Sequence, residues 1–172
     1  RFPVLVLEIA NPSCIRRTIS FCEAVFDKKV EVEGVTAKRA ESLEDAFAIY
    51  GQGQIPVMID ENGSMIQEVQ PPVVVDAILA KRNLGTKITD APAVIGVGPG
   101  FCAGKDVDAV IETQRGHNLG RVIYEGEAAP NTGIPGMIGG YAKERVIHAS
   151  ATGKLHILRQ IGEIVEAGDI LA

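Results

Sequence analysis

The sequence has no tryptophan, few aromatic residues, and no apolar run long enough to cross a membrane. A bilayer-spanning helix needs about 20 apolar residues in a row, whereas the longest apolar stretches here, residues 4–7 and 73–80, are much shorter. Positive charge is also scarce, because 17 Lys and Arg stand against 22 Asp and Glu, for a net charge of −5. Since general nucleic-acid binding relies on a basic surface, we expect a protein that binds neither nucleic acid nor membranes.

Cysteine and histidine are equally sparse. The three cysteines, Cys14, Cys22 and Cys102, include no C-x-x-C pair, which does not fit a disulfide scaffold and is typical of a reducing compartment. The three histidines lack the spacing of zinc ligands, so we expect no metal site. No secretory signal opens the chain, which favours the cytoplasm. Because Arg1 leads directly into an apolar strand, we expect this chain to be part of a longer protein.

What the sequence does contain is enough apolar material for a core. Of its 172 residues, 46% are apolar and 23% are charged, an ordinary globular balance. Strand-like apolar runs alternate with amphipathic helices in the first half of the chain. This alternation predicts an α/β fold with a Rossmann-like parallel sheet. The predicted helices are residues 15–26 and 42–51, and the predicted strands are residues 2–9, 30–34, 55–60, 73–79, 91–97 and 107–111.

The last part of the chain changes character. Residues 129–140 are dense in Gly and Pro, which is typical of a functional loop or a linker. Residues 143–172 carry β-type signals, and the pattern at 161–171 resembles the first half of the barrel-sandwich hybrid of biotinyl and lipoyl carriers. Lys154 does not occupy the position of the modified lysine, so we expect a small β module without a carrier role. We therefore predict an α/β nucleotide- or cofactor-binding domain at 1–142 and a partial barrel-sandwich-like module at 143–172.

The first candidate site lies where the first strand ends. Glu8 is at this strand end, and Arg16 and Arg17 begin the next predicted helix. Ligands of open α/β sheets bind beyond the carboxyl ends of strands. Cations at a helix start oppose the helix dipole, so an anion bound there would account for the arginine pair. A solvated pair of arginines accounts for it equally well.

The second candidate is the glycine-rich run after the strand at 91–97. Gly98 and Gly100 begin a G-x-G-x-x-A pattern, but a strand follows it instead of the helix that a dinucleotide site requires. Gly104-Lys105 is not followed by Ser or Thr, which excludes a P-loop. The loop is suited to wrapping a phosphate through its backbone, although a glycine-rich corner in the sheet is the simpler interpretation.

The third candidate comprises two polar turns. One, with Lys81, Arg82 and Asn83, follows the strand that holds Asp76, and the other runs from residue 112 to 121. In a parallel sheet both turns reach the same edge as Glu8, which predicts a basic crevice for a phosphorylated or otherwise anionic small ligand. We predict as cofactor-binding residues Glu8, Arg16, Arg17, Asp76, Lys81, Asn83, Gly98, Gly100, Arg115, His117 and Asn118. No catalytic residue is assigned, although His117 is a candidate for acid–base chemistry.

Several of these strings together resemble one family. DAILAKRNLGT at residues 76–86 and RGHNLGRVI at 115–123 are the most specific, and they are joined by residues 8–12, 15–18, 98–101, 106–113 and 133–136. They resemble the YqeB-like accessory proteins associated with selenium-dependent molybdenum hydroxylases. The resemblance implies a role in the maturation of that enzyme system. It also implies an upstream strand and glycine-rich turn, so we expect the sheet to lack its first strand here.

These observations lead to one expected function and two alternatives. We expect an accessory or maturation protein that binds an anionic nucleotide, dinucleotide or related cofactor at the strand ends, with a molybdenum hydroxylase as its partner. An NAD(P)-dependent oxidoreductase is the first alternative, with His117 or Lys81 in acid–base work. The second is a non-catalytic scaffold that docks a partner enzyme through residues 129–140.

Overall fold

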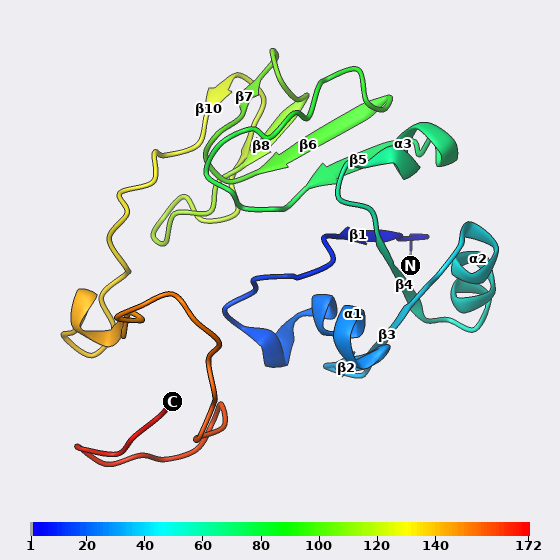
Figure 1. Cartoon of the computed structure of the whole chain (residues 1–172). Helices are drawn as coiled ribbons and strands as arrows, with labels where there is room; N and C mark the ends of the chain where they lie inside the picture. The colour runs from blue at the N-terminus through cyan, green and yellow to red at the C-terminus, as the bar shows by residue number, and fades with distance from the viewer. Residues whose placement is uncertain (1) are drawn as a thin grey trace. The chain divides into compact units, whose positions relative to one another are not determined.

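The computed structural model describes residues 2–172, and the chain forms two compact units. The first unit runs up to Ser64 and includes Ala151–Ala172, and the second is Met65–Ser150. Each unit has its own four-stranded sheet (Figure 1). The predicted division between residues 142 and 143 stays a prediction. Within residues 2–172, no helix combines the length and the apolarity needed to cross a bilayer.

The sheet of the first unit is mixed. Its order is β1-β4-β3-β2, where β1 is Val6–Glu8, β2 Lys29–Val32, β3 Val35–Arg39 and β4 Ile55–Ile59. Strand β4 runs parallel to both β1 and β3, whereas β2 and β3 are antiparallel. Strand β3 was not predicted. It exists because Glu33 and Gly34 both adopt left-handed backbone conformations, with φ of 50° and 75°, which is the requirement of a tight type I′ hairpin.

The helices of the first unit are short. The predicted helix at 15–26 is instead two 3₁₀ turns, η1 (Arg17–Ile19) and η2 (Phe21–Glu23), followed by one turn of α-helix, α1 (Ala24–Asp27). Ser20 interrupts the run, because its backbone is extended and its side chain caps η2 by accepting a hydrogen bond from the Cys22 N–H. Helix α2 (Leu43–Gly51) begins at the predicted Ser42 cap and ends at Gly51, as the sequence indicates.

A compact core lies between these turns and the sheet. Ala24 and Val25 of α1 pack with Ala37 of β3 and Val57 of β4, and all four are buried. The short helix α3 (Ser64–Val69), which was also not predicted, follows the Asn62-Gly63 turn and lies at the boundary with the second unit. The first unit therefore combines local helical turns with long-range strand pairing.

The sheet of the second unit has the order β5-β6-β8-β9. Strands β5 (Val73–Asp76), β6 (Ala93–Val97) and β8 (Ala109–Ile111) are parallel, and β9 (Val122–Ile123) runs antiparallel to β8. A separate pair joins β7 (Cys102–Ala103) to β10 (Gly126–Glu127). The core contains Val94 and Val110 at full burial, and Phe101 covers Gly96 so closely that an added Cβ would lie 2.5 Å from its ring.

The expectation of one continuous parallel sheet is wrong. The predicted strands belong to two separate sheets, and each sheet contains an antiparallel pair. Strands β2 and β9 each occupy the edge of a sheet and run antiparallel to their neighbour. In a purely parallel sheet these positions would be filled by strands that arrive through a crossover connection. No α-helix lies between β5 and β6 or between β6 and β8. The fold is therefore mixed α/β with few helices, and a Rossmann-like arrangement is not confirmed.

The β structure predicted for the C-terminal residues is not confirmed. After η3 (Lys143–Arg145), residues 146–172 contain no helix and no strand. Backbone hydrogen bonds from the Leu158 and Arg159 N–H groups to the Leu171 carbonyl close one loop of this segment. Most of its apolar side chains are exposed, Ile164 at 98%. Strands need partners on their edges, and the segment finds none among the described residues.

Candidate functional site

The predicted site residues fall into two groups, one in each unit. Glu8, Arg16 and Arg17 lie in the first unit. The other eight lie in the second unit. Asp76 is the last residue of β5, and the remaining seven lie in the loops that follow the three parallel strands: residues 77–92 after β5, 98–101 after β6 and 112–121 after β8. We call these three loops the carboxyl edge. One shared sheet edge that carries both groups does not exist, because β1 and β5 belong to different sheets.

The loops of the carboxyl edge are in direct contact, and both predicted glycines lie at the contacts. A Cβ on Gly100 would lie 2.5 Å from the Arg82 Cα, so the two backbones touch. A Cβ on Gly98 would lie 2.9 Å from the Thr113 Oγ1 and 3.4 Å from a methyl of Leu79. The glycines therefore serve close approach between loops, which is the role the sequence analysis called a glycine-rich corner.

Asp76 shapes the first of these loops. Its carboxylate is buried and accepts hydrogen bonds from the Ile78 N–H at 3.1 Å and the Thr86 Oγ1 at 2.6 Å. Both of its oxygens are thus used inside the protein. Asp76 positions the loop, and its predicted contact with a ligand stays a prediction.

Asn83 has a similar internal role. Its Oδ1 accepts from the N–H groups of Gly85 and Thr86, each at 2.8 Å, and its Nδ2 donates to the Thr86 carbonyl at 2.8 Å. Leu79 and Lys81 in the same loop adopt left-handed backbone conformations, with φ of 59° and 64°. Non-glycine residues adopt this conformation only where surrounding contacts impose it, so the loop is held in one specific shape.

A residue that the sequence analysis did not assign, Glu112, holds the other side of the carboxyl edge. Its buried carboxylate accepts from the Ala129 N–H at 2.8 Å and the Gln114 N–H at 2.7 Å. These backbone donors, Ala129 first, lower the pKa of Glu112. The carboxylate therefore ties the turn after β8 to the chain that leaves β10.

The basic side chains of this edge remain available to a ligand. Lys81, Arg82, Arg115, His117 and Arg121 are all exposed. None of these five side chains forms an ion pair with a residue of the described chain. Asn118 is also exposed, and its carbonyl accepts from the Arg121 N–H. The loops therefore combine fixed backbones with positively charged side chains that have no ion-pair partner among the described residues. This arrangement is suited to binding an anion.

A shallow cavity of about 250 Å³ lies elsewhere in the second unit. It is lined by Gly133, Pro135, Lys143, Val146 and His148. The Arg145 guanidinium supports the loop beside it by donating to the carbonyls of Gly136 and Tyr141. Arg115 approaches the same loop, since its Nη1 is 3.8 Å from the position of a Cβ on Gly136. Lys143 and His148 were not predicted, because neither belongs to a motif.

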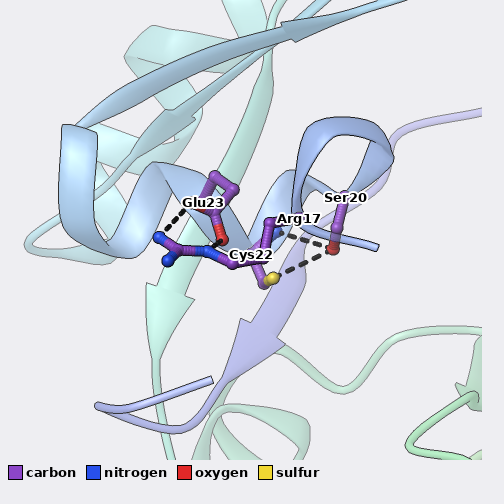
Figure 2. A network of polar contacts seen from close by, with 4 residues as sticks. All are labelled: Arg17, Ser20, Cys22 and Glu23. Carbon is purple, nitrogen blue, oxygen red and sulfur yellow. Dashed lines mark hydrogen bonds and ion pairs between the residues drawn. The ribbon is translucent and has the colours of Figure 1, made fainter. Parts of the chain in front are cut away.

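In the first unit, Arg17 is already paired (Figure 2). Its guanidinium donates to both carboxylate oxygens of Glu23, at 2.8 Å and 2.6 Å, and lies 5.5 Å from the ring centre of Phe26. The adjacent Arg16 is exposed and occupies the N-cap position of η1, where its side chain forms no capping hydrogen bond. Glu8 ends β1, where burial raises its pKa. The charge of Arg17 is therefore balanced inside the protein.

In residues 2–172, no three His, Cys, Asp or Glu side chains gather in a way that would hold a metal ion. The fold and the carboxyl edge together define a mixed α/β protein that presents cationic loops at the ends of parallel strands.

The chain is similar to "Uncharacterized protein YqeB" of Escherichia coli (strain K12). The two are 51% identical over 171 residues, which is 99% of this chain and 32% of that protein. This supports the resemblance to YqeB-like proteins, and the chain spans about a third of the relative's length. No family model matches the chain, and no solved structure matches it with significance.

Proposed function

We propose that this chain is part of an accessory protein whose second unit binds an anionic nucleotide or related cofactor at its carboxyl edge. Two observations support this proposal. Gly98, Gly100 and Asp76 fix the three loops in place, and the cationic side chains of these loops have no acidic partner among the described residues. Ligands of open α/β sheets bind at strand carboxyl ends, and phosphate groups favour arginine there.

The wider role follows from the family resemblance. We propose that the protein acts in the maturation of a selenium-dependent molybdenum hydroxylase, with the bound nucleotide or cofactor as the species it handles. We also propose that the strands belong to a Rossmann-like scaffold and that residues 143–172 are part of a barrel-sandwich-like module. A crystal structure of the full-length Escherichia coli relative would test both structural proposals, since it would show whether helices cover the sheet and whether these residues pair as strands.

Isothermal titration calorimetry with ADP and NAD⁺ tests the site. Arg115→Ala and Lys81→Ala should each weaken binding by about 10- to 100-fold, because each removes one charge-assisted contact with phosphate, worth on the order of 1.5–3 kcal/mol. Lys105→Ala is the matched control, since Lys105 is exposed but lies outside the carboxyl edge. Equal affinity in all three variants, or no binding by the unmodified protein, would rule out the site.

Arg17→Ala adds a separate arm to this experiment. Arg17 pairs with Glu23 in the first unit, so this variant reports separately on whether the first-unit group binds an anion. Turnover-linked change in nicotinamide absorbance would instead support the NAD(P)-dependent oxidoreductase.

A second candidate function, docking of a partner enzyme, is favoured by the loop after β10. Ile134, Met137, Tyr141 and Ile147 are all more than half exposed in this stretch of the second unit, and clustered exposed apolar side chains mark interaction surfaces. Binding of a purified molybdenum hydroxylase should weaken when Met137 and Ile147 are changed to Ser. Unchanged binding of that enzyme would exclude this surface.

A further inference from the structure

The cavity of about 250 Å³ in the second unit is formed by two segments of the chain that follow β10. Gly133 and Pro135 of the first segment line it, and Lys143, Val146 and His148 of the second segment complete the lining. None of the four apolar residues of the docking surface proposed above belongs to this lining. The cavity is therefore a feature distinct from that surface.

Arg145 ties the two walls of the cavity together. Its guanidinium donates to the Gly136 carbonyl at 2.5 Å and to the Tyr141 carbonyl at 3.1 Å. Gly136 directly follows the lining residue Pro135, and Arg145 directly precedes the lining residue Val146. The turn between the walls is closed as well, because the backbones of residues 138 and 141 exchange hydrogen bonds of 2.9 Å and 3.1 Å.

The polar side chains of the lining are left free for a ligand. Within residues 2–172, neither Lys143 nor His148 forms an ion pair or a side-chain hydrogen bond. The acid next to them, Glu144, is already used, since its carboxylate accepts from the Ala142 N–H at 2.9 Å. None of the five lining residues is acidic. The cavity thus carries an uncompensated positive charge.

The remaining lining is apolar, and the cavity is small. Pro135 and Val146 offer a hydrocarbon surface beside the two polar groups. A volume of about 250 Å³ is below the range of roughly 300–1,000 Å³ that is typical of pockets for drug-sized ligands. The ligand is therefore limited to a single ring or a short branched chain, which excludes a nucleotide.

We propose that this cavity binds a small organic carboxylate. The Lys143 ammonium would form a charge-assisted hydrogen bond with the carboxylate, and an imidazole N–H of His148 would donate to the same group. The apolar body of the ligand would cover Pro135 and Val146 and remove them from water. The site goes beyond the proposed function, and calorimetry with ADP does not test it, so either site can fail without the other.

Nuclear magnetic resonance of the whole ¹⁵N-labelled chain tests the site, with benzoate and 3-methylbutanoate as probes. We expect the amide signals of Gly133, Val146 and His148 to shift on titration, and those of residues 116–121 at the carboxyl edge to stay in place. Benzamide has the shape of benzoate without its charge. It should bind about tenfold more weakly or worse, because the charge-assisted contact is lost.

Variants of Lys143 identify the charge that holds the probe. Lys143→Gln should weaken benzoate binding about tenfold or more, whereas Lys143→Arg should retain most of the affinity. Lys105→Gln is the matched control, since Lys105 is an exposed lysine of the same unit outside the cavity. Because the Lys143 side chain is exposed, neither substitution there should disturb the fold.

Four results would overturn the proposal. They are no response to either carboxylate, shifts confined to residues 116–121, equal affinities for benzoate and benzamide, and equal affinities of Lys143→Gln and Lys105→Gln for benzoate. Inorganic phosphate is the remaining comparison. If it bound to the same residues as tightly as benzoate, the apolar wall would have no role and the assignment of an organic ligand would be wrong.

Discussion

Glu112 is the buried carboxylate on which the turn after β8 depends. It accepts two backbone hydrogen bonds and has no cationic partner among the described residues. Glu112→Gln should lower the free energy of unfolding by about 1–3 kcal/mol, since an amide replaces one acceptor by a donor that faces an N–H group. Urea denaturation measures this loss. The control Glu125→Gln, at an exposed position, should change stability by less than about 0.5 kcal/mol.

The same carboxylate gives stability a defined pH dependence. Because the pKa of Glu112 is lowered in the folded protein, its contribution is present above the ordinary glutamate pKa and is lost as the pH falls towards the lowered value. The difference in stability between the unmodified protein and Glu112→Gln should therefore be largest near neutral pH and shrink in acid. A difference that stays constant over this range would show that the charge is not involved.

Residue identities in the sequence indicated where polar side chains gather but not what they contact. Asp76, Asn83 and Arg17 were predicted as ligand contacts because each is polar and lies in a predicted strand or in the segment that follows one. In the structure, Asp76 accepts a hydrogen bond from Thr86, Asn83 bonds to the backbone of its own loop, and Arg17 pairs with Glu23. Asx-type loop contacts and short-range ion pairs use the same residue types as ligand sites, so sequence alone does not separate the two roles.

At the scale of elements, the shape of the carboxyl edge depends on Gly100. Its φ is +114°, and an added Cβ would lie 2.5 Å from the Arg82 backbone. Gly100→Ala should therefore destabilise the second unit by about 2–4 kcal/mol through backbone strain and forced separation of the loops. Gly104→Ala is the matched control, because Gly104 has φ +83° but no atom within 4 Å of an added Cβ. Its cost should be about 1–2 kcal/mol.

Thermal unfolding of both variants tests this difference. A Gly104→Ala variant as unstable as Gly100→Ala would show that left-handed strain, rather than loop contact, controls both positions.

Some elements could be predicted from local sequence and others could not. The Ser42 cap, followed by an amphipathic run and a final glycine, was sufficient to locate α2. The helix predicted at 15–26 was wrong over most of its length, because its apolar spacing does not reveal that Ser20 adopts an extended backbone. Strand β3 was missed because Glu33 is not a typical type I′ turn residue, although it adopts the left-handed conformation beside Gly34.

At the scale of the whole molecule, the chain contains two separate clusters of buried side chains. Val57 belongs to the cluster of the first unit and Val110 to that of the second, and both are fully buried. Val57→Ala and Val110→Ala should each cost about 2 kcal/mol. Hydrogen exchange should then show loss of protection mainly in the unit that carries the substitution. Equal loss in both units for either variant would show that they unfold together.

The division of the strands into two sheets could not be predicted from the sequence. The runs of β4 and β5 are both short and mostly apolar, and nothing in either run specifies which strand it pairs with. The parallel pairs β1–β4 and β5–β6 join residues that are far apart in the chain. Which strands pair depends on how the faces of the whole sheet pack against the rest of the protein. The periodicity of apolar residues in the sequence indicates only that a strand is present.

The register of β1 also sets the order in which the first sheet is assembled. The β2–β3 hairpin joins neighbouring segments, with Val32 opposite Val35, whereas Val6 of β1 is opposite Val57 of β4. Closing a short loop is fast, and non-local pairing is slow. On the ribosome, therefore, Val6 cannot pair with Val57 until Val57 has emerged, and the segment that carries Cys14 and Cys22 stays open to other nascent chains and to chaperones for that period.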